Sequence, residues 1–441
     1  MTPALMPLHG IGGRQDLPLP FAVVLVGAAV AVVASFIVLA LTRRTGRPAT
    51  ADGGIRLPRL TAVVDASEVR WPVRLLGVLT AGWALMALLL GPDELVNPVF
   101  GFLYVWVWVG LVPLSLLFGR VWKTLNPLRT LHLLSFKALG LDPDEGLYRL
   151  PVWVGVWPAV VGLFGFVYLE LVAPERTTIP VVLLFVALYT VALLFGGVLF
   201  GQAWFGAADP FEAYAMLMAH LSPWARGTDG MLRLRTPLTN LAGMVAGPGT
   251  VGFVTVLIGS TAYDGFSNST AWVSWVQDQE LSTTVTATLT LAGMIGAVAV
   301  TYLAGVWLAG RLTGSPLTGS PSAFIHSLLP IALGYVVAHY LTLFIFEGQR
   351  TAILWSDPLA RGWNAFGTAG REVDYSLADY PTAIALAQAA AVVVGHILGI
   401  IAAHDRAITV SPPNRAVLGQ LPMLVVMVGY TLTGLLLLFS Q

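Results

Sequence analysis

Long runs of apolar residues recur along the chain, each about twenty residues long and separated by shorter polar segments. At 1.5 Å of rise per residue, about twenty helical residues cross the roughly 30 Å of hydrocarbon in a bilayer. The runs predict ten spans, at residues 19–42, 72–91, 98–118, 152–172, 180–201, 238–260, 284–310, 323–346, 381–403 and 416–439. The sequence therefore predicts an all-α fold, a polytopic transmembrane helical bundle that forms one domain over residues 1–441.

The composition narrows the chemistry that this chain can carry out. Hydrophobic residues make up 56% of it and charged residues 10%, against about 25% charged residues in soluble domains. The chain has no cysteine, which excludes disulfides, thiol nucleophiles and Cys-ligated metals. A net charge of zero gives no basic surface for nucleic acid. We expect the lipid bilayer as its main partner and no nucleic-acid partner, and protein partners stay open.

Arginine and lysine gather in alternate loops, which predicts the orientation of the bundle. Most basic residues lie in the loops 43–71, 119–150 and 202–237, and again at Arg406 and Arg415. The long loop 347–380 is an exception, whose three arginines are balanced by acidic residues. Short loops rich in Arg and Lys stay on the cytoplasmic side. We therefore predict a multi-pass protein of the cell (inner or plasma) membrane with both termini extracytoplasmic.

Two neighbouring stretches resemble each other, which predicts an internal repeat. Residues 70–148 and 149–236 each form a hairpin that ends in Phe-Gly, a Trp and an Asx-Pro pair. The matched positions, which lie 82 or 83 residues apart, are Phe118-Gly119, Trp122 and Asn126-Pro127 in the first hairpin and Phe200-Gly201, Trp204 and Asp209-Pro210 in the second. Both hairpins keep the same orientation, so the repeat is parallel, as in some transporters. A third repeat at 237–318, a His-bearing hairpin at 319–415 and a last span at 416–441 complete the predicted organisation. The alternative, that any two apolar hairpins look alike, stays open.

The Asx-Pro pairs predict how two short helices begin. Asn126 and Asp209 can each cap the following helix, and proline fits the first helical position. The amphipathic segments that follow, 128–140 and 211–222, are predicted to lie at the cytoplasmic interface, with His132 and His220 solvated. A re-entrant hairpin that lines a cavity is the alternative. Two pairs of glycines spaced four residues apart, Gly197 with Gly201 and Gly395 with Gly399, predict close helix packing.

Histidines are the main polar groups expected at depth, because no Asp, Glu, Lys or Arg lies near the middle of a predicted span. His326, His396 and His404 can converge if the spans that carry them are neighbours, with Asp405 as a partner for an imidazole. Imidazoles suit a divalent transition metal. Haem fits less well, because His396 and His404 are only eight residues apart. A proton relay, a contact with substrate and simple hydrogen-bonded packing are the open alternatives.

A separate substrate-binding group is predicted further outward. His339 lies thirteen residues after His326, too far along the helix to share its site. We expect Tyr335 to hydrogen-bond His339, with Glu347 and the loop at Asp357 facing the pair from outside. Two long outer loops, 262–280 and 347–380, also carry tryptophans and acidic residues, among them Asp264. These loops form a second candidate surface.

Parts of the sequence resemble a group of multi-spanning membrane proteins of actinobacteria, some of which carry the label fenitrothion hydrolase. The resemblance rests on HGIGGRQDLPLP with His9, Arg14 and Asp16, on HSLLPIALGYVVAHY from His326, and on GHILGIIAAHDRAI from Gly395. It implies hydrolysis of organophosphate esters, for which metal-activated water is the obvious route. His326, His396, His404 and Asp405 are then the implied metal ligands.

Three functions remain open on the sequence. The first is a permease with a polar, His-lined path for a small molecule or metal ion, which rests on span count, parallel repeats and fold-level analogy. The second is a membrane-embedded metal- or haem-dependent enzyme, either the hydrolase that the resemblance implies or a redox protein. The third is a structural or assembly subunit of a membrane complex. Nucleotide-binding loops and nucleophile elbows are absent from the sequence.

Overall fold

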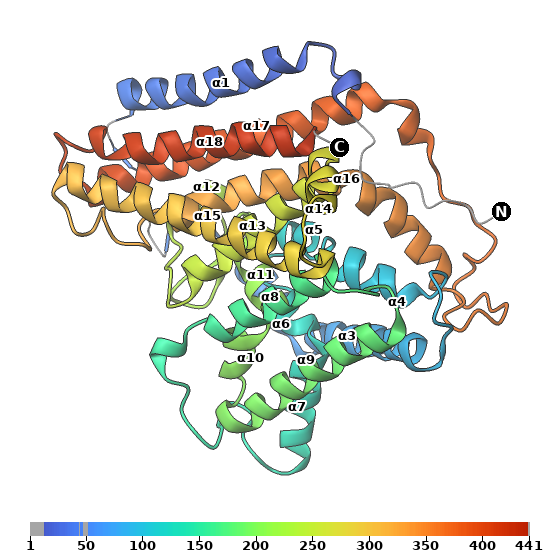
Figure 1. Ribbon diagram of the computed structural model, residues 1–441. Coiled ribbons are helices and arrows are strands. Elements are labelled where there is room, and N and C mark those ends of the chain that lie inside the picture. The colour runs from blue at the N-terminus through green and yellow to red at the C-terminus, as the bar shows by residue number, and fades with distance from the viewer. Residues whose placement is uncertain (1–12, 44, 47–51, 440–441) are drawn as a thin grey trace.

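The computed structural model describes residues 13–43, 45–46 and 52–439, and these residues form a bundle of helices (Figure 1). His9 of the N-terminal motif falls outside the described residues. The first half contains α1 (Phe21–Thr42), α2 (Pro58–Asp65), α3 (Ser67–Leu90), α4 (Pro98–Gly101), the π-helical η2 (Phe102–Val107), α5 (Leu111–Phe118), α6 (Trp122–Leu125), α7 (Pro127–Ala138), α8 (Trp157–Leu171), α9 (Ile179–Phe200), α10 (Ala203–Ala208) and α11 (Pro210–Ala219). The second half contains α12 (Pro237–Ala242), α13 (Thr250–Ser267), α14 (Thr270–Gln277), α15 (Thr283–Thr313), α16 (Leu328–Leu354), α17 (Pro381–Val410) and α18 (Leu421–Leu438).

Short elements join these helices. They are the 3-10 turns η1 (Arg14–Asp16), η3 (Val152–Val154), η4 (Ile325–Ser327), η5 (Ser376–Asp379) and η6 (Leu418–Gln420), and the strands β1 (Ile55–Arg56), β2 (Trp224–Arg226) and β3 (Leu232–Leu234). The strands form a small antiparallel sheet in the order β1-β3-β2.

Within the described residues, eight helices are long and apolar enough to cross a bilayer, and a bent pair makes a ninth candidate. The eight are α1, α3, α8 with η3, α9, α15, α16 with η4, α17, and α18 with η6. Each coincides with a predicted span. The predicted span 98–118 is broken, because α4 with η2 and α5 meet at an angle of 44°. The chain is therefore a polytopic, all-α membrane bundle.

The one remaining predicted span, 238–260, does not form as one helix. The short α12 ends at Ala242, and α13 begins only at Thr250, after a break that contains Gly243, Gly247, Pro248 and Gly249. Gly249 has a φ of +84°, a left-handed conformation that glycine adopts without strain. Helix α13 then continues to Ser267, past the predicted end, and two thirds of its residues are buried among α8, α15, α16 and α18. Its polar residues, which include Asp264, therefore belong to the bundle and not to an outer loop.

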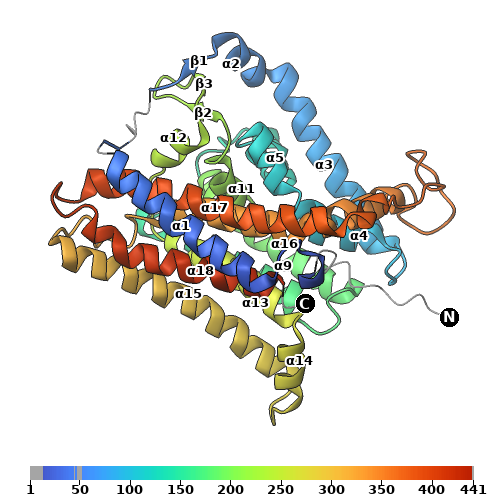
Figure 2. The same ribbon diagram turned by 90° about the horizontal axis from the view of Figure 1, so that it is seen from above.

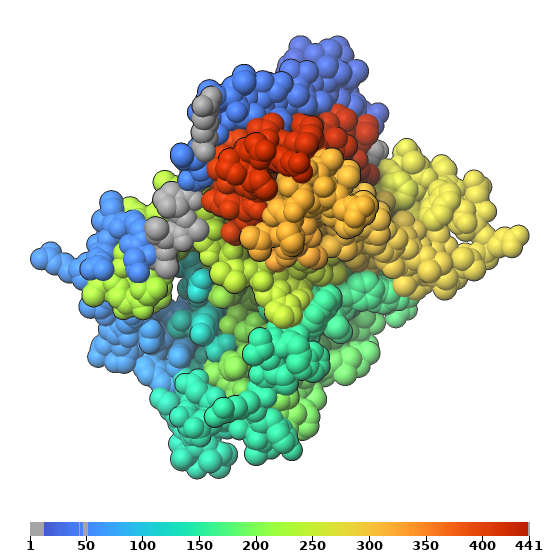
Figure 3. Space-filling model, turned by 90° about the vertical axis from the view of Figure 1, so that its left-hand side faces the viewer, coloured from blue at the N-terminus to red at the C-terminus, as the bar shows by residue number. Residues whose placement is uncertain are grey.

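The loops with many arginines meet at one end of the bundle. Strand β1 in the loop 43–71 pairs with β3 in the loop 202–237. Arg43, which begins the first of these loops, lies 3.3 Å from Asp405 in the second half of α17. Figure 3 shows the blue and lime surfaces of these loops in contact. At the opposite end Arg14 donates to the backbone carbonyl of Phe439, at 2.6 Å, so the first and last described segments lie together. This grouping is what the predicted orientation requires, and which end faces the cytoplasm stays a prediction.

Helices α16 and α17 form the closest pair in the bundle, and Figure 2 shows α17 running beside α1, α18 and α16. A Cβ added at Gly395 would lie 2.6 Å from the carbonyl oxygen of Pro330, and one at Gly399 would lie 2.7 Å from that of Ser327. Both contacts are shorter than van der Waals distance. The predicted packing role of Gly395 and Gly399 is confirmed.

The two helices after the Asx-Pro pairs begin as the sequence predicts. The side chain of Asn126 accepts a hydrogen bond from the backbone of Arg129, and that of Asp209 accepts one from Phe211, with proline next in each case. Their predicted place at the interface is wrong for α11, whose residues are nearly all buried, and for His132, which is 3% exposed. Both segments contact other helices through polar side chains. An amphipathic pattern alone does not show whether the polar face of a helix contacts water or polar groups inside the protein.

Candidate functional site

The histidines predicted to bind a metal are held by other partners. In His404, Nδ1 lies 2.8 Å from the side-chain oxygen of Gln420 and Nε2 lies 3.2 Å from the backbone carbonyl of Arg43. Asp405 is paired with the guanidinium of Arg43. Neither residue therefore has a free ligand atom directed at the other histidines.

His326 and His396 are buried, and each has one ring nitrogen without a partner among the described residues, Nδ1 in His326 and Nε2 in His396. His396 hydrogen-bonds the carbonyl of Val392 on its own helix. It lies eight residues from His404, about 12 Å along the helix. In the described part of the chain, no three His, Asp or Glu side chains come close enough to hold a metal. The predicted convergence of His326, His396, His404 and Asp405 on one metal therefore has no support from the described residues, and it stays a prediction.

His339 connects α16 to α13 through a buried polar contact. Its Nε2 lies 2.9 Å from the Oδ2 atom of Asp264 on α13, and the hydroxyl of Tyr340 donates to the same oxygen at 2.8 Å. All three residues are buried. Because α16 continues to Leu354, His339 lies near the middle of its helix and not far outward as predicted. A buried carboxylate next to an imidazole is an arrangement that can accept or release a proton.

The other predicted substrate-binding residues divide into two groups. Tyr335 stacks on His339, with ring centroids 5.8 Å apart, but its hydroxyl has no hydrogen-bond partner among the described residues, so the predicted bond to His339 does not form. Asp357 accepts backbone hydrogen bonds from Arg361 and Gly362 and shapes a loop. Glu347 lines a cavity and lies 3.6 Å from Arg350.

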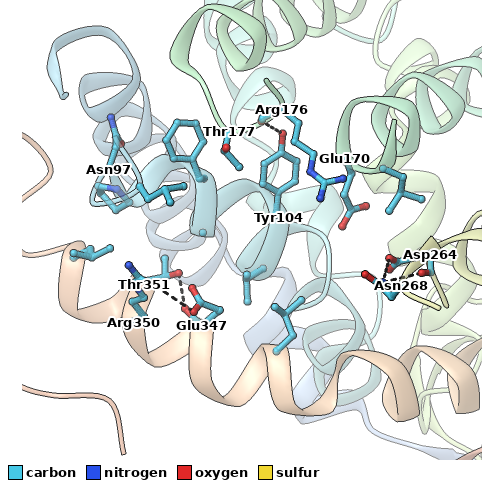
Figure 4. A pocket seen from close by; sticks show the side chains of 18 of the residues that line it. Asn97, Tyr104, Glu170, Arg176, Thr177, Asp264, Asn268, Glu347, Arg350 and Thr351 are labelled. Atoms are coloured by element: carbon cyan, nitrogen blue, oxygen red, sulfur yellow. Dashed lines mark hydrogen bonds and ion pairs between the residues drawn. The ribbon is translucent and has the colours of Figure 1, made fainter. Parts of the chain in front are cut away.

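We call this cavity the polar cavity. It has a volume of about 260 Å³ and lies among three candidate spans and α13. Its walls come from α4 with η2, from the end of α8 and the loop after it, from α13, and from the second half of α16. Ionisable side chains from these walls line it, as Figure 4 shows: Glu170, Arg176, Asp264, Glu347 and Arg350. The π-helical η2 contributes Tyr104, whose hydroxyl donates to the carbonyl of Arg176 at 2.6 Å. Irregular backbone of this kind is tolerated at membrane depth where it lines a cavity.

A group of buried aromatic rings extends from the Tyr104 wall of the polar cavity. We call Trp108, Phe166, Phe211 and Tyr214 the aromatic layer. Phe166 lies one turn before Glu170 on α8, and its ring centroid is 6.3 Å from that of Tyr104 in the cavity wall. The rings of Trp108 and Phe166, of Trp108 and Tyr214, and of Phe166 and Phe211 have centroids 5.0, 5.0 and 5.2 Å apart. All four side chains are nearly inaccessible to solvent.

A second set of ionisable groups adjoins the aromatic layer at Phe211, through Trp122 and Tyr189. We call Asn126, Arg129, Gln202, Asp209 and Glu212 the buried polar cluster. Asp209 precedes Phe211 and accepts hydrogen bonds from Asn126, Trp122 and Tyr189, at 2.7, 3.1 and 2.9 Å. Arg129 donates two hydrogen bonds to the carboxylate of Glu212, at 2.8 and 3.1 Å, and a third to Gln202. The cluster is fully hydrogen-bonded, which makes it stable in a low-dielectric interior.

The two parts of the buried polar cluster join equivalent positions of the predicted repeat. Asn126 and Asp209 are 83 residues apart, and so are Arg129 and Glu212. The opposite charges of Arg129 and Glu212 at matched positions of the repeat were a signal in the sequence from which this pair was not predicted. Asp264 was predicted to lie in an outer loop, although Thr261, Asp264 and Asn268 follow a helical spacing and Asp264 lies in α13.

These observations define a class of protein. The long apolar helices identify a multi-pass membrane protein, with a polar cavity and a buried polar cluster inside the bundle. The chain matches no protein-family model, and searches of curated proteins and of solved structures find no match either.

Proposed function

We propose that the protein is a permease that moves a small polar solute through the helix bundle, with the polar cavity as its binding site. The observation that carries this proposal is the sequence of environments along one path. A cavity with five ionisable side chains adjoins the aromatic layer through Tyr104 and Phe166, and the buried polar cluster adjoins the same layer at Phe211. Alternating polar sites and an apolar barrier are what a gated path through lipid requires.

The helix breaks support the same proposal. The candidate span of α4, η2 and α5 bends by 44° where it passes the cavity. Gly119 and Gly201 have φ angles of +66° and +65° and end α5 and α9 just before the buried polar cluster. Discontinuous helices frame the substrate sites of many transporters, because their free backbone groups and their hinges lie there.

The hydrolase that the resemblance implies has less support. Its implied ligands His404 and Asp405 are occupied by Gln420 and Arg43, and no alternative ligand set occurs in the described part of the chain. The Asp264–His339 pair is better suited to exchange a proton with the cavity, which Asp264 lines.

Uptake into liposomes tests the proposal. The purified protein is reconstituted and supplied with labelled amines, amino acids and small carboxylates. We expect saturable uptake of at least one solute, and its loss in Ser267→Trp, where the indole fills the polar cavity. Ser274→Trp, on the exposed face of α14, is the matched control and should transport normally. Uptake no faster than in protein-free liposomes, or normal uptake by Ser267→Trp, would contradict the proposal.

A further inference from the structure

The carboxylate of Glu170 is the feature of the polar cavity that calls for a ligand. Glu170 is partly exposed and lines the cavity, and its Oε2 atom is buried without a hydrogen-bond partner among the described residues. Burying an ionised carboxylate oxygen without a hydrogen-bond donor or a positive partner costs roughly several kcal/mol of folding free energy. A ligand that brings a donor and a positive charge would remove that cost.

The other carboxylates of the cavity already have donors. Asp264 receives hydrogen bonds from His339, Tyr340 and Asn268. Glu347 lies 3.6 Å from Arg350. Figure 4 shows Arg176 beside Glu170, and its charge acts on the Glu170 carboxyl group, but no hydrogen bond from Arg176 reaches the Oε2 atom. Glu170 is therefore the carboxylate on which a ligand can have the largest effect.

The surroundings of Glu170 favour an ammonium group over a metal ion. The aromatic rings of Phe100 and Tyr104 line the same cavity, and aromatic faces attract organic cations. Metal ions such as Ca²⁺ require six or more oxygen ligands, and no cluster of three acidic or histidine side chains suited to a metal occurs among the described residues. Leu171 and Leu343 supply apolar wall for a short carbon chain.

The size and net charge of the cavity agree with this class of ligand. Its volume of about 260 Å³ is below the range typical of sites for drug-sized molecules. Three carboxyl groups and two guanidinium groups line it, so its acidic side chains outnumber its basic ones. We infer that the polar cavity binds a small aliphatic amine, with the ammonium group on Glu170 and the carbon chain against the leucines. This inference rests on the proposed role of the cavity as the solute site.

Three probes with the same four-carbon chain test the inference: n-butylamine, 4-aminobutyrate and butyrate. Binding to the full-length protein in nanodiscs is measured by calorimetry. We expect n-butylamine and 4-aminobutyrate to bind and butyrate not to bind. In Glu170→Gln, which keeps the shape and removes the charge, the affinity for n-butylamine should fall at least tenfold. Glu175→Gln, in the exposed loop after α8, is the matched control and should bind as wild type.

Several outcomes would overturn the inference. These are binding of butyrate in place of the amines, unchanged amine affinity in Glu170→Gln, and absence of binding by all three probes. The permease proposal fails separately. Amine binding without uptake in liposomes would contradict transport and leave the ligand class in place. Uptake of butyrate would contradict the ligand class and leave transport in place.

Discussion

Two buried carboxylates in this protein, those of Asp264 and Asp209, are each accommodated by several hydrogen-bond donors. Asp264 receives hydrogen bonds from an imidazole, a phenol and an amide, and Asp209 from an amide, an indole, a phenol and a backbone amide. Lipid offers no hydrogen bonds, so charge at depth requires such partners. Removing one member should therefore affect stability far more than removing a surface charge.

We expect Asp264→Ala to destabilise the protein strongly. The substitution leaves the His339 ring nitrogen and the Tyr340 hydroxyl without their acceptor, and each stranded buried donor costs about 1–3 kcal/mol. Thermal unfolding of the purified protein measures the effect. Asp278→Ala, just after α14 and exposed, is the control and should change stability by less than about 0.5 kcal/mol. Equal melting temperatures for the two variants would contradict the role given to Asp264.

At the scale of helices, polar contacts between short, broken helices hold the predicted repeats together. Asn126 begins α7 and Asp209 begins α11, and their side chains hydrogen-bond to each other. The paired positions are those that the repeat matches. The repeat remains a prediction, and the pairing gives a way to test it.

Exchanging the charges of Arg129 and Glu212 tests whether the two helices are equivalent partners. Arg129→Glu and Glu212→Arg should each cost about 3–5 kcal/mol, because each leaves like charges buried together. The double variant should recover much of that loss, since the pair is restored with its ends reversed. Thermal unfolding gives the coupling energy. Arg149→Glu, at an exposed position, is the control. A double variant no more stable than the singles would show that the two positions are not interchangeable.

Close packing of α16 on α17 gives a second prediction at this scale. In Gly395→Val the new side chain meets the backbone of Pro330, so we expect a loss of about 1–3 kcal/mol in stability. Gly293→Val on α15 is the control, because a Cβ there has open space. Unfolding in a denaturing detergent series compares them. Similar stability of the two variants would mean that α16 and α17 are not in close contact.

The sequence predicted the helices better than their polar interior. Eight predicted spans are confirmed because a run of twenty apolar residues is a strong local signal. Span 238–260 was placed wrongly because Gly243, Gly247, Pro248 and Gly249 break the helix, and because α13, which is two-thirds buried, carries polar residues such as Ser260 and Asp264 that lower its apolar character. The metal site was predicted from residue type and helix position alone. The direction of each side chain could not be predicted in this way, and His404 contacts Gln420 and Arg43 and not His396.

For the whole molecule, the small sheet joins two basic loops that are far apart in sequence. Asp65 before α3 contacts Arg70 at 2.5 Å and Arg226 of β2 at 2.7 and 2.9 Å. The hydrogen bond from Arg226, with the charges of Arg226 and Arg70, lowers the pKa of Asp65 below its ordinary value of 3.8, against the effect of burial. The ionised carboxylate therefore links α2, α3 and the sheet.

The lowered pKa of Asp65 predicts how this region responds to acid. A carboxyl group with a lowered folded-state pKa stabilises the fold above its unfolded pKa, and this contribution is lost as the pH falls through the folded-state pKa. We expect the protection factors of amides in residues 55–65 and 224–234, which correct for the pH dependence of intrinsic exchange, to begin to fall as the pH drops below about 3.8. Asp65→Asn should show low protection already at pH 7, and Asp278→Asn should behave as wild type. Protection in this region that is the same in Asp65→Asn and in wild type at pH 7 would contradict the link.

Thiol accessibility tests the central claim that a polar cavity opens inside a membrane bundle. The chain has no cysteine, so single cysteines can be introduced without background. A charged, membrane-impermeant thiol reagent should label Ser267→Cys in the polar cavity from the predicted extracytoplasmic face only. It should label Gly230→Cys, in the β2–β3 turn, from the opposite face only, and Val300→Cys on the outer surface of α15 from neither. An unreactive Ser267→Cys, or labelling of Val300→Cys at the same rate, would contradict the account.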